Sequence, residues 1–180
     1  MVNKTPLLEN KFILTREMNR KYAQYTYEKY HSRTRFITLL VSIIIFAAAF
    51  AVAAFLKWVI LFLVLLLIGF YFFFLSWFGY LLTARVSYND MTRFYGNPVN
   101  MHVTFYPEFF SVKGDDNSFE FPYAQVSDVI NLPDMTILTI SSKGSVTHGQ
   151  VIDKKAFTEE ELNKFYEILF TRIGKTAVHK

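Results

Sequence analysis

The side chains best able to bind a metal or move a proton are four scattered histidines, namely His31, His102, His148 and His179. None lies in an HExxH pattern or beside a pair of carboxylates, so the spacing predicts solvated or strand-face histidines and no metal site. The sequence contains no cysteine, which excludes disulfides, thiolate ligands and cysteine nucleophiles. No phosphate-binding loop, GxSxG elbow or GxGxxG motif occurs. We therefore expect neither an enzyme nor a cofactor.

Two short patterns could suggest other chemistry. The run Asp115-Asp116-Asn117 offers oxygen ligands for calcium, but it lacks the alternating ligands and the distant glutamate of an EF-hand loop. Because the run follows Gly114, a hairpin turn is the better interpretation. Asn3-Lys4-Thr5 is formally a glycosylation sequon, and it would be silent on a cytoplasmic terminus.

The basic charge is concentrated near the start of the chain. The net charge is +4, with eight Lys or Arg against three acids in residues 1–35, only Lys57 in residues 36–84, and ten against twelve in residues 85–180. A pI near 9.2 therefore does not indicate a basic nucleic-acid-binding domain, because most of the excess precedes an apolar region.

That apolar region consists of two runs, 36–56 and 59–82. The first is about 21 residues long, which as a helix gives roughly 31 Å, enough to cross the hydrocarbon core of a bilayer. Only Lys57 and Trp58 separate the runs, so we expect antiparallel neighbours forming a transmembrane hairpin over residues 36–84. Trp58 and Trp77 would mark its two interfaces, roughly 28 Å apart along a helix.

The orientation follows from the flanking cations. Basic residues precede the first run and follow the second, against Lys57 alone in the loop, which predicts two spans in the cell membrane with both termini cytoplasmic. The predicted membrane-interface anchors are Arg33, Arg35, Lys57, Trp58, Trp77, Tyr80 and Arg85. The competing interpretation, a cleaved signal peptide ending at Ala51-Val52-Ala53, requires a shorter and less acidic leader.

The predicted spans contain no Asp, Glu, His or Arg in their cores, and this argues against a transport pathway. The first span carries small residues at helical spacing, Ala47, Ala51 and Ala54 with Ala49 and Ala53, and the second offers Phe62, Phe70, Phe73 and Phe74. These faces indicate close packing between the two helices or, alternatively, plain contact with lipid.

The segment before the hairpin, within residues 1–35, is predicted to be a basic helix. Met18, Tyr22 and Tyr25 share one helical face, and no Gly or Pro interrupts residues 15–35. Three interpretations remain open for it: a helix in the lipid headgroup region, an extension of the first span into water, or an element packed on the C-terminal domain.

Residues 85–180 are predicted to be a cytoplasmic domain. After the turn at Gly96-Asn97-Pro98, six short stretches rich in β-branched and aromatic residues predict an antiparallel meander: 101–106, 109–113, 118–121, 125–132, 136–141 and 145–152. Thr158 and Glu161 form a capping-box pattern before an apolar stripe of Leu162, Phe165, Leu169 and Ile173. The fold class expected is membrane α+β, with a helical hairpin followed by a small antiparallel pleckstrin-homology-like barrel and a C-terminal helix.

The order of these parts resembles the YcxB-like family of bacterial membrane proteins. The stretches that carry the resemblance are LTREMNRKYAQYTYEKY, VTFYPEFFSV, FPYAQVSDVINL and VIDKKAFTEEELNKFYEIL. The resemblance implies a pleckstrin-homology-like C-terminal domain and no catalytic motif.

Phosphoinositide binding, which such a domain could suggest, is disfavoured because acids surround Lys113 in the first hairpins and the pair Lys154-Lys155 is a weak patch. The leading hypothesis is a non-enzymatic, membrane-tethered module that binds a protein partner or its own copy, with the lipid bilayer and no nucleic acid as its other partner. The alternative is a membrane-protective or bacteriocin-immunity-type protein that acts through the hairpin.

Overall fold

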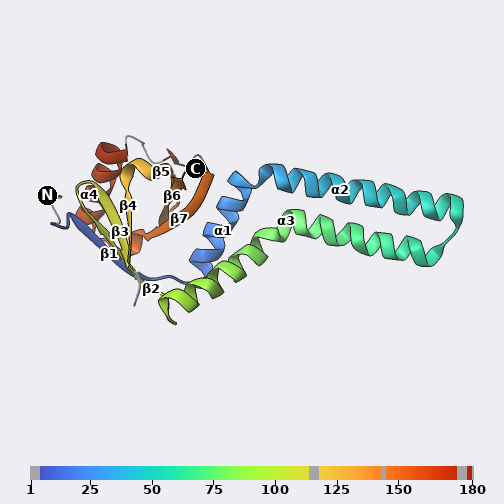
Figure 1. Ribbon diagram of the computed structural model, residues 1–180, viewed down its shortest axis with the longest axis horizontal. Helices are drawn as coiled ribbons and strands as arrows, with labels where there is room; N and C mark the ends of the chain where they lie inside the picture. The colour runs from blue at the N-terminus through green and yellow to red at the C-terminus, as the bar shows by residue number, and fades with distance from the viewer. Residues whose placement is uncertain (1–4, 114–117, 143–144, 174–177, 180) are drawn as a thin grey trace. The chain divides into compact units, whose positions relative to one another are not determined.

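The structure is a computed structural model that describes residues 5–113, 118–142, 145–173 and 178–179 (Figure 1). The chain forms two compact units. One, the sheet domain, comprises Met1–Asn19 with Tyr88–Lys180. The other, the hairpin unit, comprises Arg20–Ser87.

The sheet domain contains two four-stranded sheets. The first has the order β1 (Leu8–Ile13), β2 (Asn100–Phe105), β3 (Phe109–Lys113) and β4 (Ser118–Pro122), all antiparallel. The second has the order β7 (Ser145–Asp153), β6 (Met135–Ser142), β5 (Val126–Asn131) and β8 (Val178–His179), with β8 parallel to β5. The six strands expected after residue 100 are confirmed. In the described residues the sheets do not close on each other by strand pairing, so the structure shows two sheets rather than a barrel.

The strand β1 was not anticipated from the sequence. Leu8, Asn10 and Phe12 are buried while the residues between them are exposed, which is the alternation of a strand with one buried face. It pairs with β2 from Leu8 opposite Phe105 to Ile13 opposite Asn100. The N–H of Leu14 donates to the carbonyl of Val99 at 2.9 Å, directly after the paired strands. The hairpin unit is therefore an insertion between two adjacent strands of one sheet.

An aromatic core joins the first sheet to the C-terminal helix α4 (Glu159–Ile168), which continues as a π-helical segment, Leu169–Ile173. Phe105, Phe110 and Phe165 are fully buried. The ring centroid of Phe105 lies 5.3 Å from that of Phe165 and 6.0 Å from that of Phe110, within the range of favourable aromatic contacts. The stripe expected on this helix is buried at Phe165 and Leu169, and Ile168 joins it.

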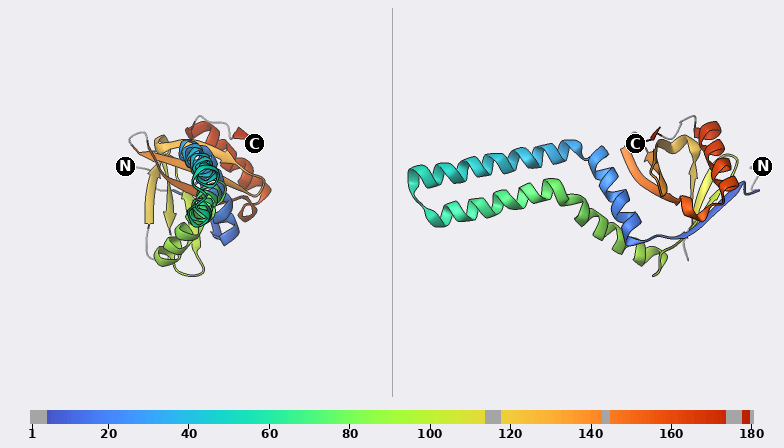
Figure 2. Two further views of the ribbon diagram at one scale, coloured as in Figure 1. Left: turned by 90° about the vertical axis from the view of Figure 1, so that its right-hand side faces the viewer. Right: turned by 180° about the vertical axis from the view of Figure 1, so that it is seen from behind.

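The hairpin unit contains most of α1 (Arg16–Tyr30), α2 (Ser32–Ala51), a π-helical segment Val52–Leu56, and α3 (Val59–Tyr95) up to Ser87. The first turn of α1 and the last turns of α3 belong to the sheet domain. Figures 1 and 2 show α2 and α3 running side by side in antiparallel directions. Lys57 adopts a left-handed conformation with φ 54° in the short connection between them. The helical stretches Ser32–Leu56 and Val59–Arg93 are each long and apolar enough to cross a membrane. Within the most apolar part of each, only 11% of the residues are buried, unlike the core helix of a soluble protein.

The face of α2 that packs on α3 agrees with the alanines expected there only at Ala49. Ser42 and Ala49 are fully buried, whereas Ala47, Ala51 and Ala54 are exposed. The Ser42 hydroxyl donates to the carbonyl of Gly69 at 3.0 Å. A Cβ placed on Gly69 would lie 2.8 Å from Cε1 of Phe46, so this glycine is required for the close approach of the helices. The exposed alanines are therefore not covered by any other part of the hairpin unit.

Candidate functional site

The predicted membrane-interface residues lie at the two ends of the hairpin unit. Lys57 and Trp58 occupy the closed end, where both are exposed. At the open end the Arg35 guanidinium lies over the Trp77 ring, 5.0 Å from its centroid. Arg33 and Arg85 are exposed and Tyr80 is half-buried. The structure thus brings Arg35 and Trp77 together, and the anchoring role of all seven residues stays a prediction.

The helix α1 packs on α3 rather than continuing α2. The helix breaks at His31, whose backbone angles, φ −109° and ψ 18°, are not helical. The Tyr27 hydroxyl donates to the carbonyl of Leu75 at 3.3 Å. A Cβ on Gly79 would lie 2.8 Å from that hydroxyl, and Ala23 on the same helix is 1% exposed. The expected tyrosine face is only half-buried, so the packed face of α1 is centred on Ala23 and Tyr27.

The outer face of the first sheet carries a charged cluster. The Nζ atom of Lys11 lies 2.8 Å from Oε2 of Glu9, and Nε2 of His102 lies 3.1 Å from the same oxygen. The hydroxyl of Thr104 lies 3.3 Å from Nε2 of His102. The hydrogen bond from Lys11 holds the pKa of the Glu9 carboxyl below its ordinary value, and His102 acts in the same direction. The lone carboxylate is thus already paired with two basic groups.

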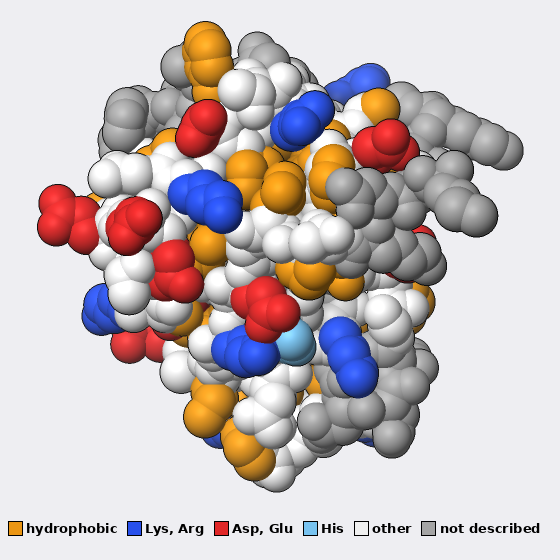
Figure 3. All heavy atoms as spheres, turned by 90° about the vertical axis from the view of Figure 1, so that its left-hand side faces the viewer, with side chains coloured by type: hydrophobic (Ala, Val, Ile, Leu, Met, Phe, Trp, Pro, Cys, Tyr) orange, Lys and Arg blue, Asp and Glu red, His pale blue; other side chains and the backbone are white. Residues whose placement is uncertain are grey.

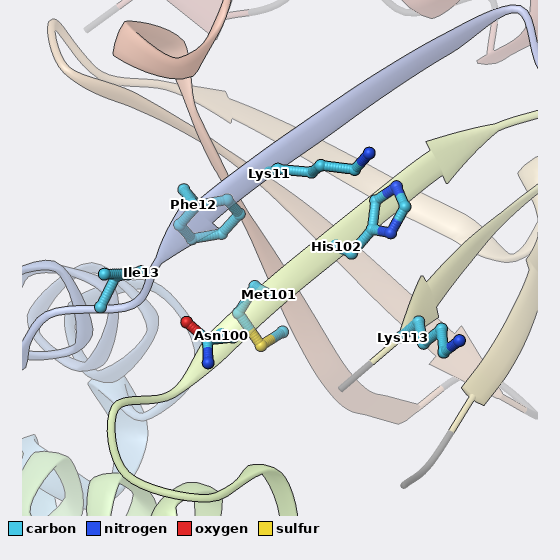
Figure 4. A pocket seen from close by; sticks show the side chains of 7 residues that line it. All are labelled: Lys11, Phe12, Ile13, Asn100, Met101, His102 and Lys113. Atoms are coloured by element: carbon cyan, nitrogen blue, oxygen red, sulfur yellow. The ribbon is translucent and has the colours of Figure 1, made fainter. Parts of the chain in front are cut away.

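A hollow of about 550 Å³ lies beside this cluster (Figure 4). Its lining residues come from β1, β2 and β3 and are Lys11, Phe12, Ile13, Asn100, Met101, His102 and Lys113. Figure 3 shows charged side chains of both signs beside a histidine on this side of the sheet domain. Within the described part of the chain, no group of three or more His, Cys, Asp or Glu side chains could hold a metal.

Among the described strands, β4 forms one edge of the first sheet, where its pairing partner is β3. Its residues are mostly exposed, and Phe119 is 48% exposed. Stacking holds Phe119 near Phe121, with ring centroids 6.5 Å apart. An open strand edge with an accessible aromatic side chain can pair with a strand from another chain.

A continuous part of the sheet domain matches a known family. Residues 105–169 are YcxB-like, matching the family model described as YcxB-like protein. This confirms the resemblance over β3 to β7 and α4. The YcxB-like match leaves out β1 and the hairpin unit. No curated protein and no solved structure matches the chain.

Sequence reasoning missed the pairing of Glu9 with His102. The two residues are 93 positions apart, and only their strand register, with Lys11 opposite His102, makes them neighbours. The alternation of Leu8 and Phe12 with Glu9 and Lys11 is the signal that indicates this strand.

Proposed function

We propose that this protein is a non-enzymatic interaction module held in the cell membrane by its hairpin unit. Both termini face the cytoplasm, and the sheet domain, with a pleckstrin-homology-like arrangement, binds a protein partner or a second copy of the chain beside the membrane. The single observation that carries the proposal is the exposed apolar surface of two antiparallel helices inserted into one sheet domain.

The exposed side chains of α2 and α3 support membrane insertion. Large residues such as Ile60 at 82% and Leu67 at 71% exposure have no covering partner in the hairpin unit. Each such side chain left in water loses roughly 1.5–3 kcal/mol of the favourable free energy that burial would give. A bilayer removes that cost, and helical hydrogen bonding satisfies the backbone inside it.

The corner between the sheets supports the pleckstrin-homology-like arrangement. The side-chain amide of Asn10 in β1 donates to the carbonyl of Asp153 at the end of β7, at 2.9 Å. Asn10 is fully buried. This bond brings an edge strand of the first sheet beside an edge strand of the second, as in a sheet that wraps around a core with α4 packed against Phe105.

The open β4 edge is the surface that we assign to the partner. To test this assignment, Glu120→Cys is introduced into the otherwise cysteine-free chain and a photo-crosslinker is attached to the new cysteine. Membranes that contain the full chain are then irradiated. We expect a discrete adduct, at twice the mass of the chain if the partner is a second copy. Phe119→Lys places a charge on the edge and should abolish the adduct.

Lys155→Cys, at an exposed position in the 3-10 turn just after β7, is the matched control and should give no such adduct. If the position-120 adduct persists in the Phe119→Lys protein, or if none forms, the proposed interaction through β4 is wrong. Circular dichroism of each variant establishes that the sheets remain folded.

A further inference from the structure

We infer that the open end of the hairpin unit binds the phosphate groups of anionic phospholipids through Arg33, Arg35 and Arg85. This inference rests on the proposed membrane insertion, and it adds a ligand class and a set of binding residues. Nothing in the family match assigns a ligand to these positions, which lie outside residues 105–169.

The first support is the charge of the hairpin unit. Residues 20–87 contain seven Lys or Arg and a single acid, Glu28. Six of the seven cations lie in 20–35 or at Arg85, whereas Lys57 alone lies at the closed end. The side chain of Glu28 already accepts a hydrogen bond from Gln24 at 3.2 Å. The open end therefore carries a surplus of positive charge that suits an anionic surface.

The second support is the level at which the arginines lie. The contact of Arg35 with Trp77 fixes α2 against α3 at this end. Arg85 follows Trp77 by eight residues, which is roughly 12 Å along a helix. Tryptophan prefers the boundary between hydrocarbon and headgroups. The arginines beside and beyond Trp77 accordingly reach the depth of lipid phosphates.

The third support is the geometry of Arg35. The Arg35 guanidinium lies over the Trp77 ring, and the planar fork of N–H donors of a guanidinium can bind phosphate in a bidentate manner. Arg33 and Arg85 are exposed. In the described residues, none of the three arginines has a carboxylate within ion-pair distance. Phosphate oxygens would supply acceptors for these donors.

The packing of α1 brings a further cation to the open end of the hairpin unit. The Tyr27 contact with Leu75 and Gly79 fixes α1 on α3 near Trp77. Lys29, which follows Tyr27 and is exposed, is thereby kept close to this end of the hairpin unit. The helix thus contributes one further cation, Lys29, near the three arginines.

The chain offers a direct test because it has only two tryptophans, Trp58 and Trp77. The full chain with Trp58→Phe is reconstituted in phosphatidylcholine vesicles containing a small fraction of brominated phosphatidylglycerol or, separately, brominated phosphatidylcholine. Bromine quenches only nearby tryptophan. We expect phosphatidylglycerol to quench Trp77 roughly twofold more strongly at equal mole fraction, given the attraction of each cation to anionic lipid.

Replacing the arginines by Arg33→Gln, Arg35→Gln and Arg85→Gln together should remove the preference. Lys154→Gln with Lys155→Gln, in the sheet domain, should leave it unchanged. Glycerol phosphate added in solution distinguishes the two sources of phosphate: no effect supports a lipid site, and loss of the preference assigns the site to a soluble phosphate.

Equal quenching by the two brominated lipids would overturn this inference and leave membrane insertion intact. No quenching by either lipid would instead contradict the proposed insertion itself. A preference that survives in the triple arginine variant would show that other groups select the lipid, and the assignment to these arginines would be wrong.

Discussion

Thr158 and Glu161 hold the first turn of α4 by reciprocal hydrogen bonds. The Thr158 hydroxyl accepts from the N–H of Glu161 at 3.3 Å, and the Glu161 carboxylate accepts from the N–H of Thr158 at 2.8 Å. Thr158→Ala should lower the free energy of unfolding by about 1 kcal/mol. Thermal melting in detergent should show a drop of roughly 4–8 °C. Thr171→Ala is the control, because its exposed hydroxyl only donates back to the carbonyls of Glu167 and Ile168 in the preceding turn.

The hydrogen bonds between Thr158 and Glu161 also predict that the stability of the fold depends on pH. The hydrogen bond from the backbone of Thr158 lowers the pKa of the Glu161 carboxyl below its ordinary value of 4.5. The ionised carboxylate therefore stabilises the fold fully above pH 4.5, and this stabilisation is lost as the pH falls through the folded-state pKa. Glu161→Gln keeps a side chain able to cap but removes the charge. The wild type should have a higher free energy of unfolding than Glu161→Gln at neutral pH, and this difference should shrink on acidification. A difference that stays constant from neutral pH to below the folded-state pKa would contradict a stabilising role for the ionised Glu161 carboxylate.

Gly79 permits the close approach of Tyr27 to α3. A Cβ at this position would lie 2.8 Å from the Tyr27 hydroxyl and 3.1 Å from Cζ. Gly79→Ala should thus destabilise the packing of α1 by about 1–3 kcal/mol, the usual cost of overpacking. Because the nearest atom is the hydroxyl, Tyr27→Phe should recover part of this loss. A double-mutant cycle measured by denaturant unfolding in micelles checks the coupling. Strictly additive effects would argue against the contact.

At the scale of elements, β1 is expected to be indispensable to the sheet domain although it lies outside the YcxB-like match. It buries Leu8 and Phe12, each worth roughly 1.5–3 kcal/mol, which is a large share of the stability of a typical domain. We expect residues 96–180 alone to unfold readily. Joining residues 5–15 to residues 96–180 by a short Gly/Ser linker should restore cooperative melting.

The control for this experiment carries Leu8→Asp and Phe12→Asp in the linked version, which keeps the length but removes the buried face of β1. Near-ultraviolet circular dichroism during heating reports the packing of the aromatic core. If residues 96–180 alone melted at the same temperature as the linked version, β1 would be only an accessory strand.

The sequence predicted what local patterns determine. Alternation located the strands from β2 to β7, and the Thr158 and Glu161 spacing located the start of α4 within one residue. It did not predict β1, because six residues that include Asn10 are a weak signal and the partner strand lies some ninety residues away. Long-range pairing of this kind is set by the tertiary fold rather than by local preference.

The packed face of α2 also could not be read from hydrophobicity. In a helix that is apolar all round, no polar face indicates which side meets a neighbour. The hydroxyl of Ser42 and the absent side chain of Gly69 were the informative positions, because small and weakly polar residues allow close helix packing. Of the alanines that the spacing singled out, Ala49 lies on the packed face, whereas the other four are exposed.

At the scale of the whole molecule, the insertion between β1 and β2 gives the sheet domain two covalent connections to the hairpin unit. The chain leaves the first sheet after Ile13 and returns at Asn100, and Leu14 bonds to Val99 where the two connections meet. In the proposed membrane-inserted state, both connections therefore reach the membrane from the same side. An odd number of spans between β1 and β2 would separate two strands that are hydrogen-bonded partners.

This constraint leads to the prediction of topology. Single cysteines are introduced at Lys57→Cys and at Lys155→Cys in the otherwise cysteine-free chain, and intact cells are treated with a membrane-impermeant thiol reagent. We expect labelling at position 57 from outside and labelling at position 155 only after the membrane is permeabilised, because the flanking arginines and lysines favour the cytoplasmic side. Lys11→Cys, on β1, must behave as position 155 does, since β1 and β2 are paired. The reverse pattern would invert the orientation, whereas opposite behaviour of positions 11 and 155 would contradict the insertion of an even number of spans.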